Sequence, residues 1–272
     1  MSLDKLAGRS NLYPDVKEFN LIEKIEPLLR AGFFFRKEDG KISARLSHIW
    51  DIPWISVKRD QYRECMLWHQ ILFRHMDVVP SFCLNCWKVV ARPNTLHEMF
   101  QLHDLMVDWD RSSKIGIEVR AYVQSLYGAY FYNNSLEEGK DCLDFVKDGT
   151  LKHIGKELSD TVHLKRYCTE FELKYGDSDK FVQRPEDRTW EKLVHESFAF
   201  EDFPLSADPP PLIKQHIVQK LIEYAAKMKD PTVAQYNNGK QPMPEIVKYG
   251  RSSVDPSKIR EGNADPNNRP GN

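Results

Sequence analysis

The sequence feature that most constrains the fold is the alternation of apolar and polar residues in KIGIEVRAYV, residues 114–123. Successive side chains of a β-strand point to opposite faces, so a segment with this period has one apolar and one polar face. The pattern predicts a strand that covers a hydrophobic core with one face only. The apolar positions are Ile115, Ile117, Val119, Ala121 and Val123, and the polar positions are Gly116, Glu118, Arg120, Tyr122 and Gln124.

The neighbouring segments extend this strand into a β-β-α-β block. YGAYFY, residues 127–132, has strand character after a short turn, and TVHLKRYCTEFELK, residues 161–174, returns to strand. Ser135 can cap a helix that has an acidic first turn and runs to about Lys147. We therefore expect an α+β fold with mixed helices, a small antiparallel sheet and helices on one face of that sheet.

The first half of the chain carries further local signals. FFFRKEDGKISARL places two strand-like runs around Asp39-Gly40, which predicts a β-hairpin. Thr95 followed by Glu98 has the pattern of a capping box at the start of a helix. Apolar periodicity predicts helices over residues 15–31, 59–76 and 96–109.

Composition excludes several classes of protein. With 41% hydrophobic and 29% charged residues, the chain of 272 residues is globular in type. The formal net charge of −1 provides no overall attraction to nucleic acid, so any such attraction must come from a local patch. No signal-peptide pattern and no run long enough to span a bilayer is visible, so we expect a cytoplasmic protein, or a virion component if the protein is viral.

The composition changes after Phe203, because ten of the 16 prolines lie from Pro204 onward. We expect an α+β core over residues 1–203 and a second region over residues 204–272. The second region would contain a Pro-rich linker, an amphipathic helix over residues 212–229 and an extended arm over residues 230–272 that ties the chain to other protein subunits. The residues predicted to dock this helix on a partner are Ile213, Ile217, Leu221 and Tyr224.

The segment SFCLNCWKV, residues 81–89, places Cys83 and Cys86 in a CxxC turn. Such a turn can direct two thiolates at one ion, so the pair predicts a structural metal knuckle around residues 65–90, with zinc as the expected ion. A redox dithiol and two inert buried thiols are the alternatives. The five cysteines are an odd number in a chain without an export signal, so we expect reduced thiols.

A tetrahedral site needs two further ligands. Cys65 and His69 are four residues apart on the predicted helix and therefore share a face, which would complete a Cys3His site. Cys168 is the other candidate, expected on the late strand. Cys65, Cys83, Cys86 and Cys168 together would make an all-thiolate site that also suits an iron–sulfur cluster.

Nucleic acid is a further possible ligand. On the expected sheet, Arg120, Tyr122, Tyr130 and Tyr132 could stack on bases, while Lys165 and Arg166 could meet phosphates. In the alternative interpretation, the tyrosines pack under a helix or a neighbouring subunit, with their hydroxyl groups hydrogen-bonded.

No catalytic residue is assigned in the interpretation that we favour. The chain would be a non-catalytic, metal-stabilised subunit of a larger macromolecular assembly, viral or associated with nucleic acid. The alternative from a different class is a metal-dependent nuclease that uses Asp160, Glu172 and Lys174, the residue types that hold magnesium and assist an attacking water.

Overall fold

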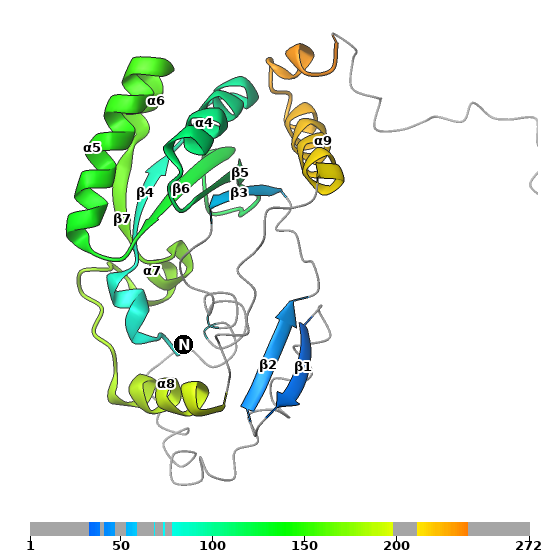
Figure 1. The fold of residues 1–272 in the computed structure, drawn as a ribbon. Helices are drawn as coiled ribbons and strands as arrows, with labels where there is room; N and C mark the ends of the chain where they lie inside the picture. Colours follow the sequence, from blue (N-terminus) through cyan, green and yellow to red (C-terminus); the bar gives the residue numbers. More distant parts are fainter. Residues whose placement is uncertain are drawn as a thin grey trace, which may run out of the picture. The chain divides into compact units, whose positions relative to one another are not determined.

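The structure is a computed structural model with an α+β fold (Figure 1). It describes residues 33–38, 41–46, 53–58, 68, 73, 78–197 and 211–238, all of which belong to one compact unit. The predicted helix over residues 15–31 lies outside the described residues, and so does that over residues 59–76 apart from two single positions. None of the helices within the described ranges is long and apolar enough to cross a membrane.

The predicted hairpin is confirmed. Strands β1 (Phe33–Glu38) and β2 (Lys41–Leu46) pair antiparallel, and Glu38 lies opposite Lys41. Asp39 and Gly40, between the two strands, lie outside the described residues.

The main sheet has five antiparallel strands in the order β3-β5-β6-β4-β7. Its last four strands along the chain are connected as β-α-β-β-α-β, the split βαβ arrangement. The strands are β3 (Trp54–Lys58), β4 (Trp87–Ala91), β5 (Ser113–Ile117), β6 (Tyr127–Asn133) and β7 (His163–Arg166), and the connecting helices are α4 (Leu96–Trp109), α5 (Leu136–His153) and α6 (Lys156–Thr161).

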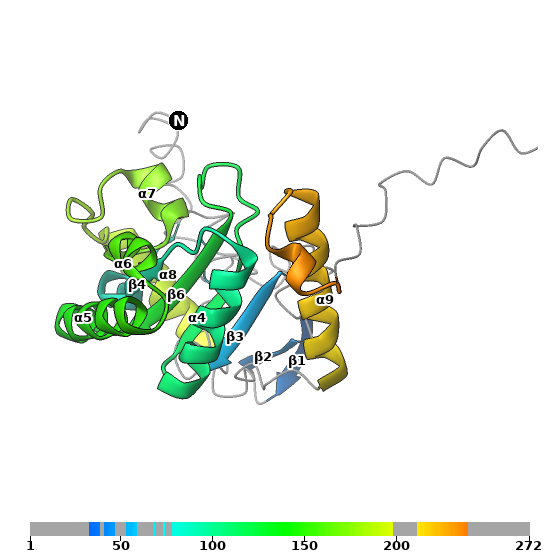
Figure 2. The same cartoon turned by 90° about the horizontal axis from the view of Figure 1, so that it is seen from above.

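The core lies between the sheet and the helices on one of its faces (Figures 1 and 2). Strand β6 illustrates the alternation: Tyr127, Ala129 and Phe131 are buried in this core, whereas Tyr130 and Tyr132 belong to a separate cluster on the opposite face. The period-two pattern of YGAYFY therefore divides the strand between two surfaces with different chemistry.

Side-chain caps fix the start of both connecting helices. Thr95 accepts a hydrogen bond from the Glu98 amide at 3.1 Å, and the Glu98 carboxylate accepts one from the Asn94 amide at 2.7 Å. Ser135 caps α5 in the same way through the Glu138 amide. Each cap contributes about 1 kcal/mol of helix stability. The helix predicted over residues 96–109 is confirmed, and α5 runs beyond the predicted Lys147 to His153.

Two predicted strands are shorter than expected. Strand β5 ends at Ile117 instead of Val123, and residues 118–126 form a loop in which the side chain of Val119 is exposed. Strand β7 covers only His163–Arg166, because Tyr167 adopts a φ of 67° and Cys168 then caps helix α7 (Thr169–Tyr175). A short 3-10 helix, η3 (Ser81–Asn85), precedes β4, and α8 (Pro185–Ser197) follows α7.

Helix α9 (Pro211–Lys227) packs on the same core. Ile217 and Leu221 are buried in the core and Ile213 packs against it, so these side chains are not available to a partner subunit, whereas Tyr224 is exposed. The apolar side of this helix therefore faces the sheet of the same chain. Helix α9 is contacted by β3, β5 and the 3-10 turn η5 (Val233–Gln235).

The segment after α9 folds back onto α4 instead of extending from residue 230 as predicted. The Asp230 carboxylate accepts hydrogen bonds from the Leu96 amide at 2.7 Å and from the Tyr127 hydroxyl at 2.6 Å. Val233 is buried in the core. Because Asp230 satisfies a free amide in the first turn of α4, it joins the end of α9 to that helix. The remainder of the predicted arm, residues 239–272, lies outside the described residues.

Candidate functional site

The sheet face opposite the helices gathers aromatic and cationic side chains in register. Lys88 on β4 lies between Tyr132 on β6 and Lys165 on β7. In the next row of the same face, Val90 lies beside Tyr130. Side chains at these alternate positions share one face, so strand register brings residues from three strands together.

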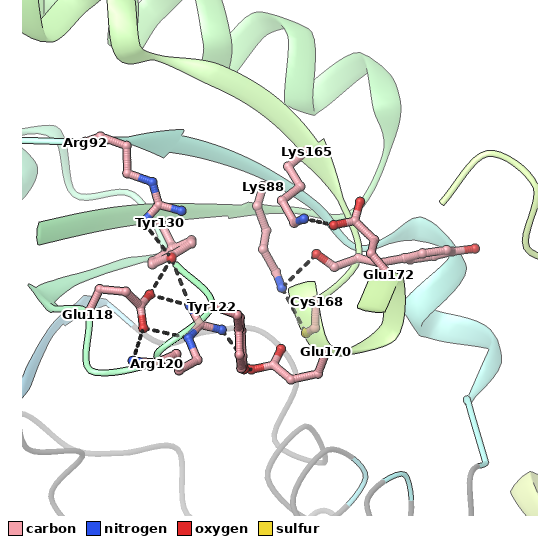
Figure 3. A network of polar contacts seen from close by, with 11 residues as sticks. Lys88, Arg92, Glu118, Arg120, Tyr122, Tyr130, Lys165, Cys168, Glu170 and Glu172 are labelled. Atoms are coloured by element: carbon pink, nitrogen blue, oxygen red, sulfur yellow. Dashed lines mark hydrogen bonds and ion pairs between the residues drawn. The ribbon is translucent and has the colours of Figure 1, made fainter. Parts of the chain in front are cut away.

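Tyr130 is the centre of a hydrogen-bond network on this face (Figure 3). Its hydroxyl accepts bonds from Arg92 Nη1 and Arg120 Nη2, each at 3.0 Å, and donates to Glu118 Oε2 at 2.9 Å. Burial raises the pKa of Tyr130, and the neighbouring Glu118 raises it further against the opposing effect of the arginines. The neutral hydroxyl therefore remains a donor to Glu118. The Trp54 ring packs against the Tyr130 ring, with 5.6 Å between the ring centroids.

Arg120 links the loop after β5 to helix α7. Its Nε donates to Glu118 Oε1 at 2.6 Å, its Nη2 contacts the second oxygen of Glu118, and its Nη1 donates to Glu170 Oε1 at 2.8 Å. Burial opposes ionisation of Glu118, but the bonds from Arg120 and Tyr130 lower the pKa of this carboxyl below its usual range. Glu118 is thus a buried carboxylate with charged and neutral donors around it, as burial of a charge requires.

Lys88 is a buried cation. Its Nζ donates to the Tyr167 carbonyl at 3.3 Å and to Cys168 Sγ at 3.0 Å, and lies 5.8 Å from the centre of the Tyr132 ring. Burial works to lower the pKa of Lys88, but the sulfurs of Cys168 and Cys86 raise it well above its usual range. The lysine therefore keeps its charge although it is 7% exposed.

Positive charge is concentrated around Lys165. Burial lowers the pKa of Lys165, and the nearby charges of Lys88 and Arg92 lower it further. Lys165 forms an ion pair with Glu172 on α7. Arg92 has no carboxylate partner within the part of the chain that the structure describes; its guanidinium lies over the Tyr130 ring at 5.3 Å. Glu172 thus balances the charge of Lys165, whereas the charge of Arg92 is not balanced by a described carboxylate.

The structure describes some of the predicted ligands of the metal knuckle. Cys83 and Cys86 are both buried, and the Cys86 amide donates to the Cys83 carbonyl at 3.2 Å. Cys65 and His69 lie outside the described residues. Among the residues that are described, no three cysteine, histidine or acidic side chains are grouped to hold an ion. Zinc or an iron–sulfur cluster at Cys83 and Cys86 therefore remains a prediction.

Cys168 is placed differently from the prediction. It precedes a helix instead of lying on a strand, and it is partly exposed. The Lys88 ammonium group donates a hydrogen bond to its sulfur. Cys168 also packs against the cluster that contains Cys83, so its role as a ligand remains a prediction.

The three residues of the nuclease hypothesis contact different partners. Asp160 forms an exposed ion pair with Lys156 at 2.6 Å on α6, whereas Glu172 pairs with Lys165. The Lys174 ammonium lies 5.6 Å from the centre of the Phe73 ring. No contact among the described residues joins Asp160 to Glu172, and the nuclease remains a hypothesis.

The predicted nucleic-acid residues fall into two groups. Tyr130, Tyr132 and Lys165 lie on the sheet face, with Arg120 and Tyr122 in the adjoining loop. Arg166 is turned elsewhere: its Nε donates to the Leu84 carbonyl at 2.7 Å and its guanidinium lies 5.5 Å from the Trp87 ring. The sequence interpretation missed four members of the site, which are Lys88, Arg92, Glu118 and Glu170.

No protein-family model, curated protein or solved structure matches the chain. The functional assignment is therefore argued from the geometry of this face.

Proposed function

We propose that this protein is a non-catalytic component that binds single-stranded nucleic acid on the sheet face opposite the helices. The observation that carries the proposal is the gathering of Lys88, Arg92 and Lys165 beside Tyr130 and Tyr132. A phosphodiester would pair with Arg92, and the partly exposed ring of Tyr132 provides a surface for a base.

The two tyrosines on β6 have different roles in the proposal. Tyr130 and Tyr132 are two residues apart on one face, which corresponds to about 6.6 Å along a strand. Tyr132 is partly exposed and is the accessible ring of the pair, whereas Tyr130 is 7% exposed and positions the two arginines. Sheets of β-α-β-β-α-β connection are one known platform for stacking single-stranded bases, a likeness at the level of fold only.

A binding role has more support than nuclease activity. The nuclease hypothesis needs carboxylates grouped around a metal, but Asp160 and Glu172 are each neutralised by a different lysine. Membership of a larger assembly and stabilisation by a metal at Cys83 and Cys86 remain parts of the proposal that need their own tests.

Fluorescence anisotropy with labelled single-stranded RNA and DNA of mixed sequence tests the proposal. Arg92→Gln removes a cation that has no carboxylate partner among the described residues, and Lys140→Gln removes an exposed cation from α5 as the matched control. We expect Arg92→Gln to weaken binding several-fold and to reduce the slope of log K against log salt by about 0.7, as for one lost phosphate contact. Equal effects of the two substitutions, or no binding by wild type at low salt, would contradict the proposal.

A further inference from the structure

The loop of residues 118–126 is tied to helix α7 across the network that contains Tyr130. Arg120 Nη1 donates to Glu170 Oε1 at 2.8 Å, and the Tyr122 hydroxyl donates to the same oxygen, also at 2.8 Å (Figure 3). One carboxylate oxygen therefore holds both a cation and an aromatic ring of the loop, although 50 residues separate it from Arg120.

The two carboxylates on Arg120 differ in how easily they can be replaced. The Glu118 side chain is fully buried and is also bonded by the Tyr130 hydroxyl and the Arg120 amide. The Glu170 side chain is 24% exposed and comes from the first turn of a short helix. A fully buried charge that loses its partner is heavily penalised, whereas a partly exposed pair separates at a lower cost because water can reach both ions. Glu170 is thus the partner that an incoming anion can displace.

Arg120 and Tyr122 would be useful to the proposed ligand if they were released. Arg120 donates to Tyr130 and therefore lies beside the face that carries Lys88 and Arg92. Tyr122 is 46% exposed, so its ring is already accessible from solvent, while its hydroxyl is held by Glu170. A phosphate in place of the Glu170 carboxylate would accept from the same guanidinium edge.

We propose that Glu170 is a built-in competitor of the ligand's phosphate for Arg120, and that it sets the affinity of this face for single-stranded nucleic acid. The proposal rests on the function proposed above. In the free protein, Glu170 occupies the Nη1 edge of Arg120, while Glu118 binds the rest of the guanidinium, and Glu170 holds the loop against α7. In the complex, a phosphodiester replaces Glu170 on Arg120, and Tyr122 is free to stack on a base.

Glu170→Gln tests this regulation, with Glu223→Gln as the matched control. Glu223 forms an exposed ion pair with Lys220 on α9, so both substitutions remove one negative charge and weaken one partly exposed pair. We expect Glu170→Gln to bind labelled single-stranded RNA roughly two- to five-fold more tightly than wild type, the range of one surface ion pair. The salt slope should steepen by about 0.7, because in wild type the displaced Glu170 carboxylate takes up a cation from solution and offsets one released from the phosphate, whereas the neutral amide in Glu170→Gln takes up none. Glu223→Gln should match wild type.

Hydrogen–deuterium exchange in the absence of RNA separates the two proposals. Faster exchange of residues 118–126 in Glu170→Gln, but not in Glu223→Gln, supports the restraint of the loop by Glu170. The competitor proposal is overturned if exchange of residues 118–126 is unchanged in Glu170→Gln. It is also overturned if exchange is faster but RNA binding is unchanged or weaker and the salt slope is unchanged. If wild type and both variants fail to bind RNA at low salt, the proposed function itself is wrong, and the competitor proposal is overturned with it.

Discussion

The ammonium group of Lys88 lies 3.0 Å from the sulfur of Cys168, a residue 80 positions further along the chain. This contact joins the second strand from the sheet edge to the start of α7. It places a cation beside the most accessible of the four cysteines in the described residues, since Cys83, Cys86 and Cys142 are all buried. A neighbouring cation favours the thiolate, which is the reactive form of cysteine.

Cys168 should therefore be the fastest-reacting thiol among the described cysteines. We expect one fast phase with a chromogenic disulfide reagent at neutral pH, its loss in Cys168→Ser, and a several-fold slower phase in Lys88→Met, because the cation is then absent. The rate is followed by absorbance on native protein. A fast phase that persists in Cys168→Ser, or that is unchanged in Lys88→Met, would show that the contact does not activate this sulfur.

The predicted knuckle is tested by metal analysis of protein purified without chelator. If Cys83 and Cys86 hold an ion, Cys83→Ser and Cys86→Ser should lose it and lower the melting temperature, because binding energy of a structural metal is folding energy. Colourless protein with about one zinc per chain is the expected result, and brown absorption would indicate an iron–sulfur cluster. Cys142→Ser serves as the control, since Cys142 lies in the main core. Absence of metal from wild type would remove the knuckle hypothesis.

Asp230 should contribute strongly to stability. Burial opposes its ionisation, but hydrogen bonds from Thr232, Tyr127 and the Leu96 amide lower the pKa of this carboxyl. We expect Asp230→Asn to reduce the free energy of unfolding by about 2 kcal/mol, the scale of a hydrogen bond to a charged group. Urea unfolding measures this, with exposed Asp148→Asn as the control.

The same substitution predicts a change in pH dependence. A carboxyl whose folded pKa is depressed contributes its full stabilisation above the unfolded pKa, and the contribution is lost as pH falls through the folded value. The difference in stability between wild type and Asp230→Asn should therefore shrink below the usual titration range of aspartate. A difference that stays constant down to acid pH would mean that the charge of Asp230 is not what stabilises the fold.

Two glycines on the sheet should respond differently to alanine. A Cβ at Gly116 would lie 2.2 Å from the Pro53 carbonyl oxygen, whereas one at Gly128 would lie 2.7 Å from the end of the Arg92 side chain. Backbone cannot move aside easily, so Gly116→Ala should cost about 2 kcal/mol of stability. Gly128→Ala should cost less but weaken RNA binding by displacing Arg92. Thermal melts and anisotropy on both variants check this pair, and equal melting temperatures would contradict it.

Much of the fold follows from local signals. Thr95 and Glu98 define the start of α4, the sequence around Asp39-Gly40 predicts the pairing of β1 with β2, and the alternation in β6 places Phe131 and Tyr132 on opposite faces. Each of these features depends on neighbouring residues only, so the sequence contains the information needed to predict it.

The site could be predicted only in part, because long-range contacts assemble it. Alternation continues through Val123, but β5 ends at Ile117, and Arg120 pairs with a residue on α7. Lys88 and Lys165 become neighbours only through the pairing of β4 with β7. An alternating pattern gives the face of a residue but neither the order nor the register of the strands.

Photocrosslinking of single-stranded RNA to the native protein, with the modified residues mapped by mass spectrometry, tests the nucleic-acid interface most directly. We predict crosslinks at Tyr132 and within residues 118–126, stronger at Tyr122 in Glu170→Gln and weaker in Arg92→Gln. Crosslinks confined to α4, α5 and α9 on the opposite side of the sheet, or none at low salt, would contradict the assignment of this face.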